Sequence, residues 1–183
     1  MAGFWDVAHR FGGDEGAVVL RGMTRALRHR GPDDDGYFHD EAAGLSLGFR
    51  RLAIVDLSAE GHQPMASPSR RYVMLFNGEV YNHDALRKQL AAAGASFRGH
   101  SDTEVMLAAI EQYGLESAVQ RFIGMFALVL WDRRDRVLTL VRDRLGIKPL
   151  YYGWVGSLFV FGSELKAITA IPNFSNPVNR DAL

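Results

Sequence analysis

The sequence predicts one α+β domain, because helical patterns occur early in the chain and two hairpin patterns follow late. The 183 residues are 48% hydrophobic, which is enough to bury one substantial core, and the length is usual for a single domain. The closing segment 173–183, NFSNPVNRDAL, is polar and rich in Asn and Pro. We therefore interpret residues 1–172 as the domain and residues 173–183 as the start of a linker.

The first helix is predicted after a short apolar run at residues 4–7 that starts a strand. Asp14 stands before a segment whose apolar residues recur at four-residue spacing, which is typical of a capped helix. The helix should end near Gly31, where glycine can take a left-handed conformation and Pro32 blocks continuation. The apolar positions of this helix are Val19, Met23 and Leu27.

Extended segments are predicted next, at residues 36–39, 45–56 and 72–76. Asn77-Gly78 follows the last of them and is the strongest short turn signal in the sequence, because both residues tolerate positive φ. We expect the chain to reverse there.

Two amphipathic helices are predicted at residues 83–93 and 102–113. Ser101 and Glu104 form a capping-box pattern at the start of the second helix. Glycines follow both helices as stop signals, at Gly94 and Gly114.

Two successive β-hairpins are predicted from residue 126 onward. FALVLW and VLTLV are separated by the charged stretch 132–136, and LYYGW and LFVFG are separated by residues 155–157. Helices early and hairpins late are typical of an α+β domain in which sheets pack against helices.

The composition argues against several classes of function. The 21 basic and 21 acidic residues cancel, so no net field attracts nucleic acid or an anionic membrane. The chain contains no cysteine, and its six histidines show no metal-ligand spacing. It has no glycine-rich phosphate-binding loop, no signal-like start and no run of eighteen apolar residues. We therefore expect a soluble cytoplasmic protein whose partner is a small molecule or another protein.

Several polar motifs each allow two interpretations. The stretch at residues 28–33 is explained as a helix terminus with cations near the negative end of the helix dipole. The guanidinium groups of Arg50 and Arg51 are explained as solvated groups at a strand edge, although a guanidinium that points into a cleft would suit a carboxylate.

The other two motifs are equally ambiguous. Asn77-Gly78 is explained as a plain hairpin turn, but a side-chain amide and a free N–H at a strand end can also form an oxyanion hole. Ser101-Asp102 is explained as a helix start, but a carboxylate in the first turn can also accept a bond from a ligand ammonium. None of these motifs decides a function by itself.

Taken together and in order, eight segments resemble the glutaminase half of glutamine-hydrolysing asparagine synthetases. They cover nearly the whole chain. The resemblance implies a class II glutamine amidotransferase domain of the N-terminal nucleophile hydrolase type, with two antiparallel sheets between helical layers in a four-layer αββα sandwich. The segments are RHRGPDDDG, RRLAIVDLS, GHQPM, FNGEVYNH, SDTEV, GMFALVLWD, RDRLGIKPLYY and SELKAI.

The resemblance also implies how glutamine is bound. Arg51 would bind the α-carboxylate of glutamine, and Glu79 and Asp102 would hold its ammonium group. Backbone groups around Ile54 and Val55 would line the same pocket.

The catalytic roles implied by the resemblance are incomplete in this chain. The side-chain amide of Asn77 and the backbone N–H of Gly78 would stabilise the tetrahedral oxyanion. In the family, a cysteine that follows the initiator methionine attacks the amide of glutamine. Here the chain begins Met1-Ala2-Gly3. We interpret Ala2 as the residue before the family's second glycine, with Cys-Gly-Ile missing; a direct exchange of cysteine for alanine is the alternative.

Either interpretation leaves no thiol, so we expect the chain to bind glutamine but to be inactive alone. The resemblance implies no cofactor in this domain, with ATP and Mg²⁺ needed only in the synthetase domain of the parent chain. It also implies a homodimer. The alternative function is a non-catalytic amidotransferase-like module that supports a synthetase with another acceptor. A serine hydrolase is disfavoured because no GxSxG motif is present.

Overall fold

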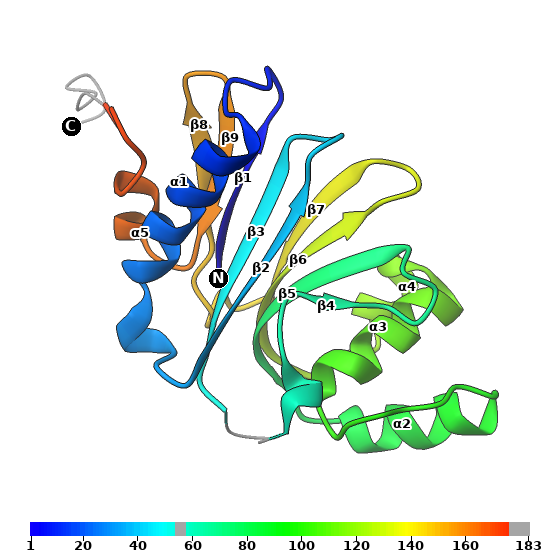
Figure 1. Cartoon of the computed structure of the whole chain (residues 1–183). Coiled ribbons are helices and arrows are strands. Elements are labelled where there is room, and N and C mark those ends of the chain that lie inside the picture. Colours follow the sequence, from blue (N-terminus) through cyan, green and yellow to red (C-terminus); the bar gives the residue numbers. More distant parts are fainter. Residues whose placement is uncertain (54–57, 176–183) are drawn as a thin grey trace.

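Two antiparallel β-sheets lie face to face in the computed structural model, which describes residues 1–53 and 58–175 (Figure 1). Every pair of neighbouring strands is antiparallel. The five-stranded sheet has the order β2 (Asp34–Asp40), β3 (Leu45–Arg51), β1 (Ala2–Asp6), β9 (Leu158–Gly162) and β8 (Tyr151–Val155). The four-stranded sheet has the order β4 (Met65–Ala66), β5 (Tyr72–Val80), β6 (Gly124–Asp132) and β7 (Val137–Arg142).

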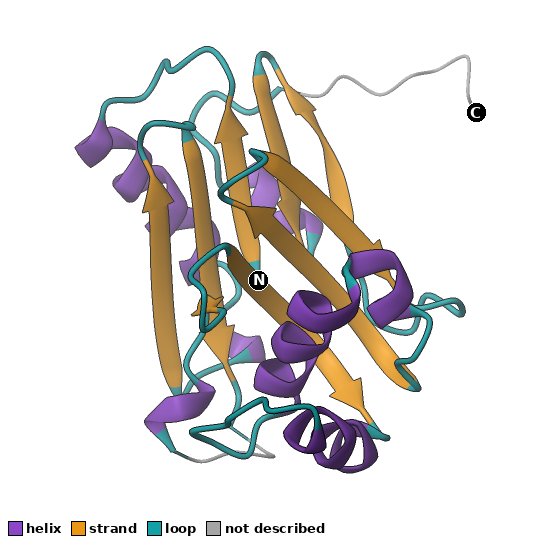
Figure 2. Ribbon diagram, turned by 90° about the vertical axis from the view of Figure 1, so that its right-hand side faces the viewer, coloured by secondary structure: helices purple, strands orange, loops and turns teal. Residues whose placement is uncertain are grey.

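Helices cover the outer face of each sheet, so the predicted four-layer αββα arrangement is confirmed. Figure 2 looks on to the helical layer of the four-stranded sheet. That layer contains α2 (His83–Ala92), α3 (Asp102–Tyr113) and α4 (Leu115–Val119), and the five-stranded sheet carries α1 (Gly13–Arg25) and α5 (Leu165–Thr169). Short 3₁₀ turns occupy Arg28–Arg30 and Ala59–Gly61.

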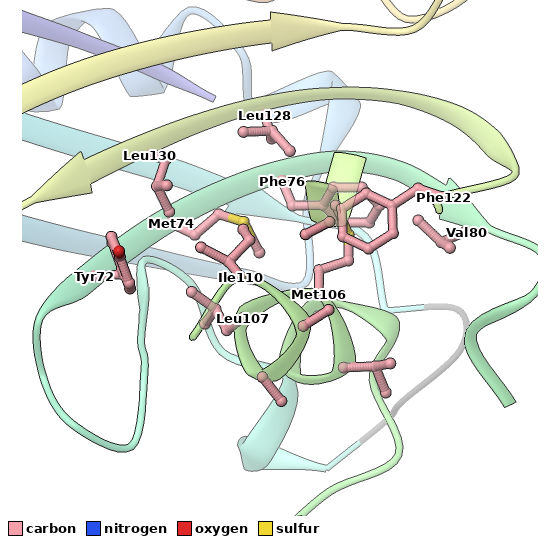
Figure 3. Packing of buried hydrophobic residues seen from close by; sticks show 14 of the residues in the cluster. Tyr72, Met74, Phe76, Val80, Met106, Leu107, Ile110, Phe122, Leu128 and Leu130 are labelled. Carbon is pink, nitrogen blue, oxygen red and sulfur yellow. The ribbon is translucent and has the colours of Figure 1, made fainter. Parts of the chain in front are cut away.

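Strand alternation builds three apolar layers between these elements. In β5, Met74 and Phe76 point towards α3 and pack against Met106 and Ile110, as Figure 3 shows. The residues between them point the other way, so Leu75 belongs to the core between the two sheets. The third core lies under α1 and α5.

The core between the sheets is densely aromatic. Trp131 of β6 is fully buried there, and its ring meets that of Trp5 edge to face with centroids 5.8 Å apart. Leu47 and Phe49 of β3 contribute to the same cluster. This core ends where β3 and β5 become polar, and that end holds the candidate site.

The predicted chain reversal at Asn77-Gly78 is wrong. Both residues lie inside β5, where Asn77 is opposite Ala127 and Gly78 is opposite Phe126. A Cβ atom on Gly78 would lie 2.2 Å from the carbonyl oxygen of Met125. The glycine is therefore needed for close approach of two strands and not for a turn.

The end of the first helix also differs from the prediction. Helix α1 begins after Gly12, which places Asp14 in the first turn and not at the cap. Gly31 is extended, with φ of −158°, and a Cβ there would lie 2.4 Å from the carbonyl carbon of Arg50. Close packing on β3 explains this glycine better than a left-handed conformation.

The predicted ranges and stop signals of the two later helices are confirmed. Helices α2 and α3 match the predicted ranges, and Gly94 and Gly114 both have positive φ. The hydroxyl of Ser101 accepts a hydrogen bond from the N–H of Glu104 at 3.3 Å. The carboxylate of Glu104 does not complete a capping box, because it accepts from the N–H groups of residues 98 and 99.

Both late hairpins form, as β6–β7 and β8–β9, but they belong to different sheets. The strand predicted at 45–56 ends at Arg51. The predicted linker lies largely outside the described residues. Among the helices in the described ranges, none has the length and apolar character needed to cross a membrane.

Candidate functional site

A cavity of about 260 Å³ lies at the end of the sandwich where β3 and β5 leave the inter-sheet core. This is slightly below the volume of roughly 300–1,000 Å³ usual for drug-sized ligands, and it suits a small metabolite. Ile54 and Val55 lie outside the described residues. The other residues predicted from the sequence line this cavity together, namely Arg51, Asn77, Gly78, Glu79 and Asp102.

Strand alternation explains why three of these side chains converge. Leu47 and Phe49 of β3 face the inter-sheet core, so Arg51 points to the same side two residues later. In β5 the same spacing from Leu75 places Asn77 on that inner side. Glu79 follows two residues after Asn77 and so lies on the same side of β5. The cavity is therefore the polar continuation of the apolar layer between the two sheets.

Asn77 carries an unused hydrogen-bond donor. Its Nδ2 atom is buried and has no hydrogen-bond partner among the residues that the structure describes. Buried polar side-chain atoms are nearly always paired, because an unpaired one costs about 1–3 kcal/mol. A donor left open on the wall of a cavity is therefore suited to an acceptor atom of a ligand.

The backbone N–H of Gly78 is the second donor at this wall. N–H groups two residues apart on a strand point to the same side. On the β5 edge turned away from β6, the N–H of Phe76 donates to Gln63 Oε1 at 2.6 Å and that of Val80 donates to Asp102 Oδ2 at 3.0 Å. The N–H of Gly78 lies between them and has no acceptor within the described part of the chain.

Asp102 brings a buried carboxylate to the cavity from the first turn of α3. Only 6% of its surface is exposed. Burial raises the pKa of Asp102, while the hydrogen bond from Val80 and the nearby charge of His83 act in the opposite direction. The carboxylate is thus partly desolvated, which strengthens its interaction with a ligand cation.

Arg51 supplies the opposite charge at the end of β3. Its Nη1 atom donates to the carbonyl oxygen of Ser58 at 2.9 Å, which ties the guanidinium to the residue that precedes the Ala59–Gly61 turn. The carboxylates of Glu79 and Asp102 line the same cavity, which therefore carries charges of both signs. Such a set of charges complements a zwitterion, as in an α-amino acid.

The structure adds polar residues that the sequence prediction did not assign to the site; among those that line the same cavity are Arg30, Arg50, Gln63 and Lys148. Gln63 is buried and joins β5 to α3, because its Nε2 donates to Thr103 Oγ1 at 3.3 Å. The signal for Gln63 was its place in GHQPM.

Arg50 and Lys148 have different surroundings at the cavity wall. Arg50 forms an ion pair with Asp35 at 3.3 Å, and its buried Nε has no partner among the described residues. Lys148 is held by a loop in which Asp143 accepts the N–H groups of Leu145, Ile147 and Lys148. Partial burial alone would raise the pKa of Asp143, but these bonds and the one from Phe126 lower it.

Comparison with known proteins agrees with this fold and shows the family. The family model of the glutamine amidotransferase domain matches residues 1–183, and the chain belongs to that family. Glutamine-hydrolysing asparagine synthetase 1 of Bacillus subtilis is 44% identical over 155 residues, which are 85% of this chain and 24% of that protein. Asparagine synthetase 3 of Arabidopsis thaliana is 44% identical over 80% of this chain and 25% of its own length.

The chain thus spans about a quarter of the length of these asparagine synthetases. Among solved structures, the glutamine phosphoribosylpyrophosphate amidotransferase of Bacillus subtilis matches 92% of this chain and 42% of its own with a TM-score of 0.75. At 21% identity this likeness shows the fold alone.

Proposed function

We propose that the cavity binds L-glutamine. Arg51 binds the α-carboxylate, and Glu79 and Asp102 hold the α-ammonium group. The side-chain amide oxygen of glutamine then accepts from Asn77 Nδ2 and from the N–H of Gly78. The open Nδ2 donor carries this proposal, because it leaves a buried group that an amide oxygen would satisfy.

The two donors also suit the transition state of amide hydrolysis. Attack on the amide carbon places negative charge on the oxygen, and donors already in position stabilise it without reorganisation. Loss of one such donor costs about 10²–10³-fold in rate in a well-studied protease. The attack needs a nucleophile, and this chain contains no cysteine. We therefore propose that these 183 residues bind glutamine without hydrolysing it.

The strand register supports the place of the nucleophile in the parent enzyme. Ala2 lies opposite Gly48 in the β1–β3 pair. Insertion of Cys-Gly-Ile between Met1 and Ala2 would extend β1 along β3 and place the cysteine opposite Arg51. Because strand residues alternate, its side chain would face the inner side, towards the cavity.

Calorimetry tests glutamine binding directly. We expect L-glutamine to bind to the 183-residue chain and Arg51→Ala to weaken binding by about tenfold or more, which is about 1.4 kcal/mol. Arg25→Ala is the matched control, because Arg25 is an exposed arginine in the last turn of α1 and should leave affinity unchanged. Equal affinity of the Arg51 variant, or no binding by the folded chain, would contradict the proposal.

We also propose that the parent protein is a cytoplasmic asparagine synthetase that passes ammonia from glutamine to ATP-activated aspartate. The identity with asparagine synthetases supports this assignment. ATP and Mg²⁺ would bind in the synthetase part and no cofactor in this domain, and the parent would form a homodimer. The second candidate, a non-catalytic glutamine-binding module, is favoured by the lack of cysteine. A start codon followed by in-frame codons for Cys-Gly-Ile, just upstream of this sequence in the gene, would favour the asparagine synthetase candidate.

A further inference from the structure

A second cavity, of about 310 Å³, lies at the opposite end of the five-stranded sheet. It is built where β1 passes into α1 and where β2 turns into β3, and Figure 1 shows both connections at the end of the sheets away from α2. Ser46 of β3 lines it, whereas Arg51 at the other end of the same strand lines the first cavity. The two sites are therefore about 17 Å apart along the strand.

Asp6 is the chemically unusual residue of this cavity. Only 3% of its surface is exposed. Its backbone N–H donates to the carbonyl oxygen of Gly44 at 2.8 Å, and its Oδ2 accepts the N–H of Phe11 at 2.8 Å. Its Oδ1 is buried without a hydrogen-bond partner in the described ranges. The carboxylate is thus fixed by the backbone, and one oxygen of this cavity-lining residue is left without a hydrogen-bond donor among the described residues.

Carboxylates outnumber cationic groups among the residues that line this cavity. The carboxylates of Asp14 and Glu41 are exposed at the rim, and a Glu41 oxygen lies 3.4 Å from where a Cβ on Gly13 would be. Burial lowers the pKa of His39, which favours its neutral form at pH 7. His9 also lines the rim. An anionic ligand is disfavoured by these carboxylates, whereas a cation is favoured.

The remaining walls are apolar and aromatic. Phe4 and Phe11 meet edge to face with centroids 5.6 Å apart, and both line the cavity. Within the described residues no three His, Asp or Glu side chains are arranged to hold a metal ion. One free carboxylate oxygen beside aromatic rings instead suits an N–H donor that carries a short hydrocarbon chain.

We propose that this cavity binds a primary alkylammonium group, which donates a hydrogen bond to Asp6 Oδ1 and packs its carbon chain against Phe4 and Phe11. Glu41, at the rim of the cavity, attracts the cation through long-range electrostatic interaction and need not contact it. The site is separate from the glutamine site, so it should fill whether or not glutamine is bound.

Calorimetry with propylammonium chloride tests this on the 183-residue chain. We expect saturable binding of propylammonium, and none of tetramethylammonium chloride, which has the same charge but no N–H donor. Asp6→Asn should lower affinity by about tenfold or more, because the side chain keeps an acceptor for Phe11 but loses its charge. Asp84→Asn is the control, since that side chain is 81% exposed on α2 and should change nothing.

A second variant keeps the proposal testable if the Asp6→Asn protein does not fold. Glu41→Gln changes an exposed side chain and should weaken propylammonium binding about two- to fivefold, as expected for a partly screened charge. L-Glutamine affinity should stay the same in both variants if they are folded. Equal binding of tetramethylammonium, no binding of propylammonium, or unchanged affinity in both variants would overturn the proposal and leave the cavity to ordered water.

Discussion

Asp102 Oδ2 accepts a hydrogen bond from the backbone N–H of Val80 at 3.0 Å. This bond joins the first turn of α3 to the end of β5, two elements that belong to different layers of the sandwich. It fixes a buried carboxylate beside the strand that carries Asn77 and Gly78. The carboxylate that we propose for the ammonium group and the donors that we propose for the amide oxygen are therefore positioned by one strand.

The first prediction concerns the charge of Asp102. Asp102→Asn should keep an acceptor for Val80 but lose the charge, so glutamine affinity should fall by about tenfold or more. Because burial raises the pKa of Asp102, the affinity of the unmodified protein should begin to fall at a higher pH than for an ordinary aspartate as the solution is acidified. Calorimetry at several pH values measures both effects. A pH-independent affinity down to the usual range of aspartate would contradict this role.

A second prediction concerns the close approach of β5 and β6. Gly78→Ala should destabilise the fold by about 1–3 kcal/mol, because its Cβ would meet the Met125 carbonyl oxygen. Gly153→Ala is the control, since a Cβ on Gly153 has no atom within 4 Å. It should change stability by no more than about 0.5 kcal/mol. Urea denaturation of both variants gives the comparison, and equal effects would show that strand packing does not require Gly78.

Gln63 is expected to be structural as well as part of the cavity wall. Gln63→Leu would leave the N–H of Phe76 buried without its acceptor, which should cost about 1–3 kcal/mol. Gln89→Leu, at an exposed position on α2, should be nearly neutral. The free energy of unfolding of each variant checks this, and a neutral Gln63 variant would mean that the bond to Phe76 is replaceable.

The fourth prediction is a pH dependence of stability. Partial burial alone would raise the pKa of Glu164, but hydrogen bonds from Lys166, Arg30 and His29 outweigh it and lower the pKa from 4.5 to about 2. A lowered carboxylate pKa stabilises the fold above the unfolded value, and this stability is lost as pH falls from 4.5 towards 2.

Glu164→Gln should therefore be less stable than the unmodified chain at pH 7, with the difference shrinking at pH 3. Glu15→Gln, at an exposed position without these partners, should show no such trend. Unfolding by urea at the two pH values measures it. A difference for Glu164→Gln that does not shrink on acidification would show that the ion pairs do not stabilise the fold.

Sequence patterns correctly predicted the ends of α2 and α3, because caps and stop signals depend only on residues close together in the chain. Gly94 and Gly114 end their helices by taking positive φ, and Ser101 caps α3 through its own side chain. The turn at Asn77-Gly78 was mispredicted because the reason for Gly78 is tertiary, namely the approach of β6. Three helices, α2, α3 and α4, separate β5 from β6 in the chain, and no local pattern encodes the pairing of these strands.

The candidate site was reached by resemblance and then assembled by the fold. Arg51, Asn77 and Asp102 are distant in sequence and meet only because two sheets and a helix converge. Arg50 and Lys148 were not assigned to the cavity, because the local sequence does not show which way a side chain points at a strand end or in a loop. The open Nδ2 of Asn77 is a property of packing that composition and spacing do not contain.

Release of ammonia from glutamine is the most direct test of the central claim that this cavity holds the amide of glutamine for attack. The comparison is between the 183-residue chain and a version with Cys-Gly-Ile inserted after Met1, which the strand register places opposite Arg51. We predict ammonia release by the extended protein alone, and its loss on Asn77→Ala. If both proteins fold and bind glutamine but neither releases ammonia, the claim is contradicted and the binding-module function takes its place.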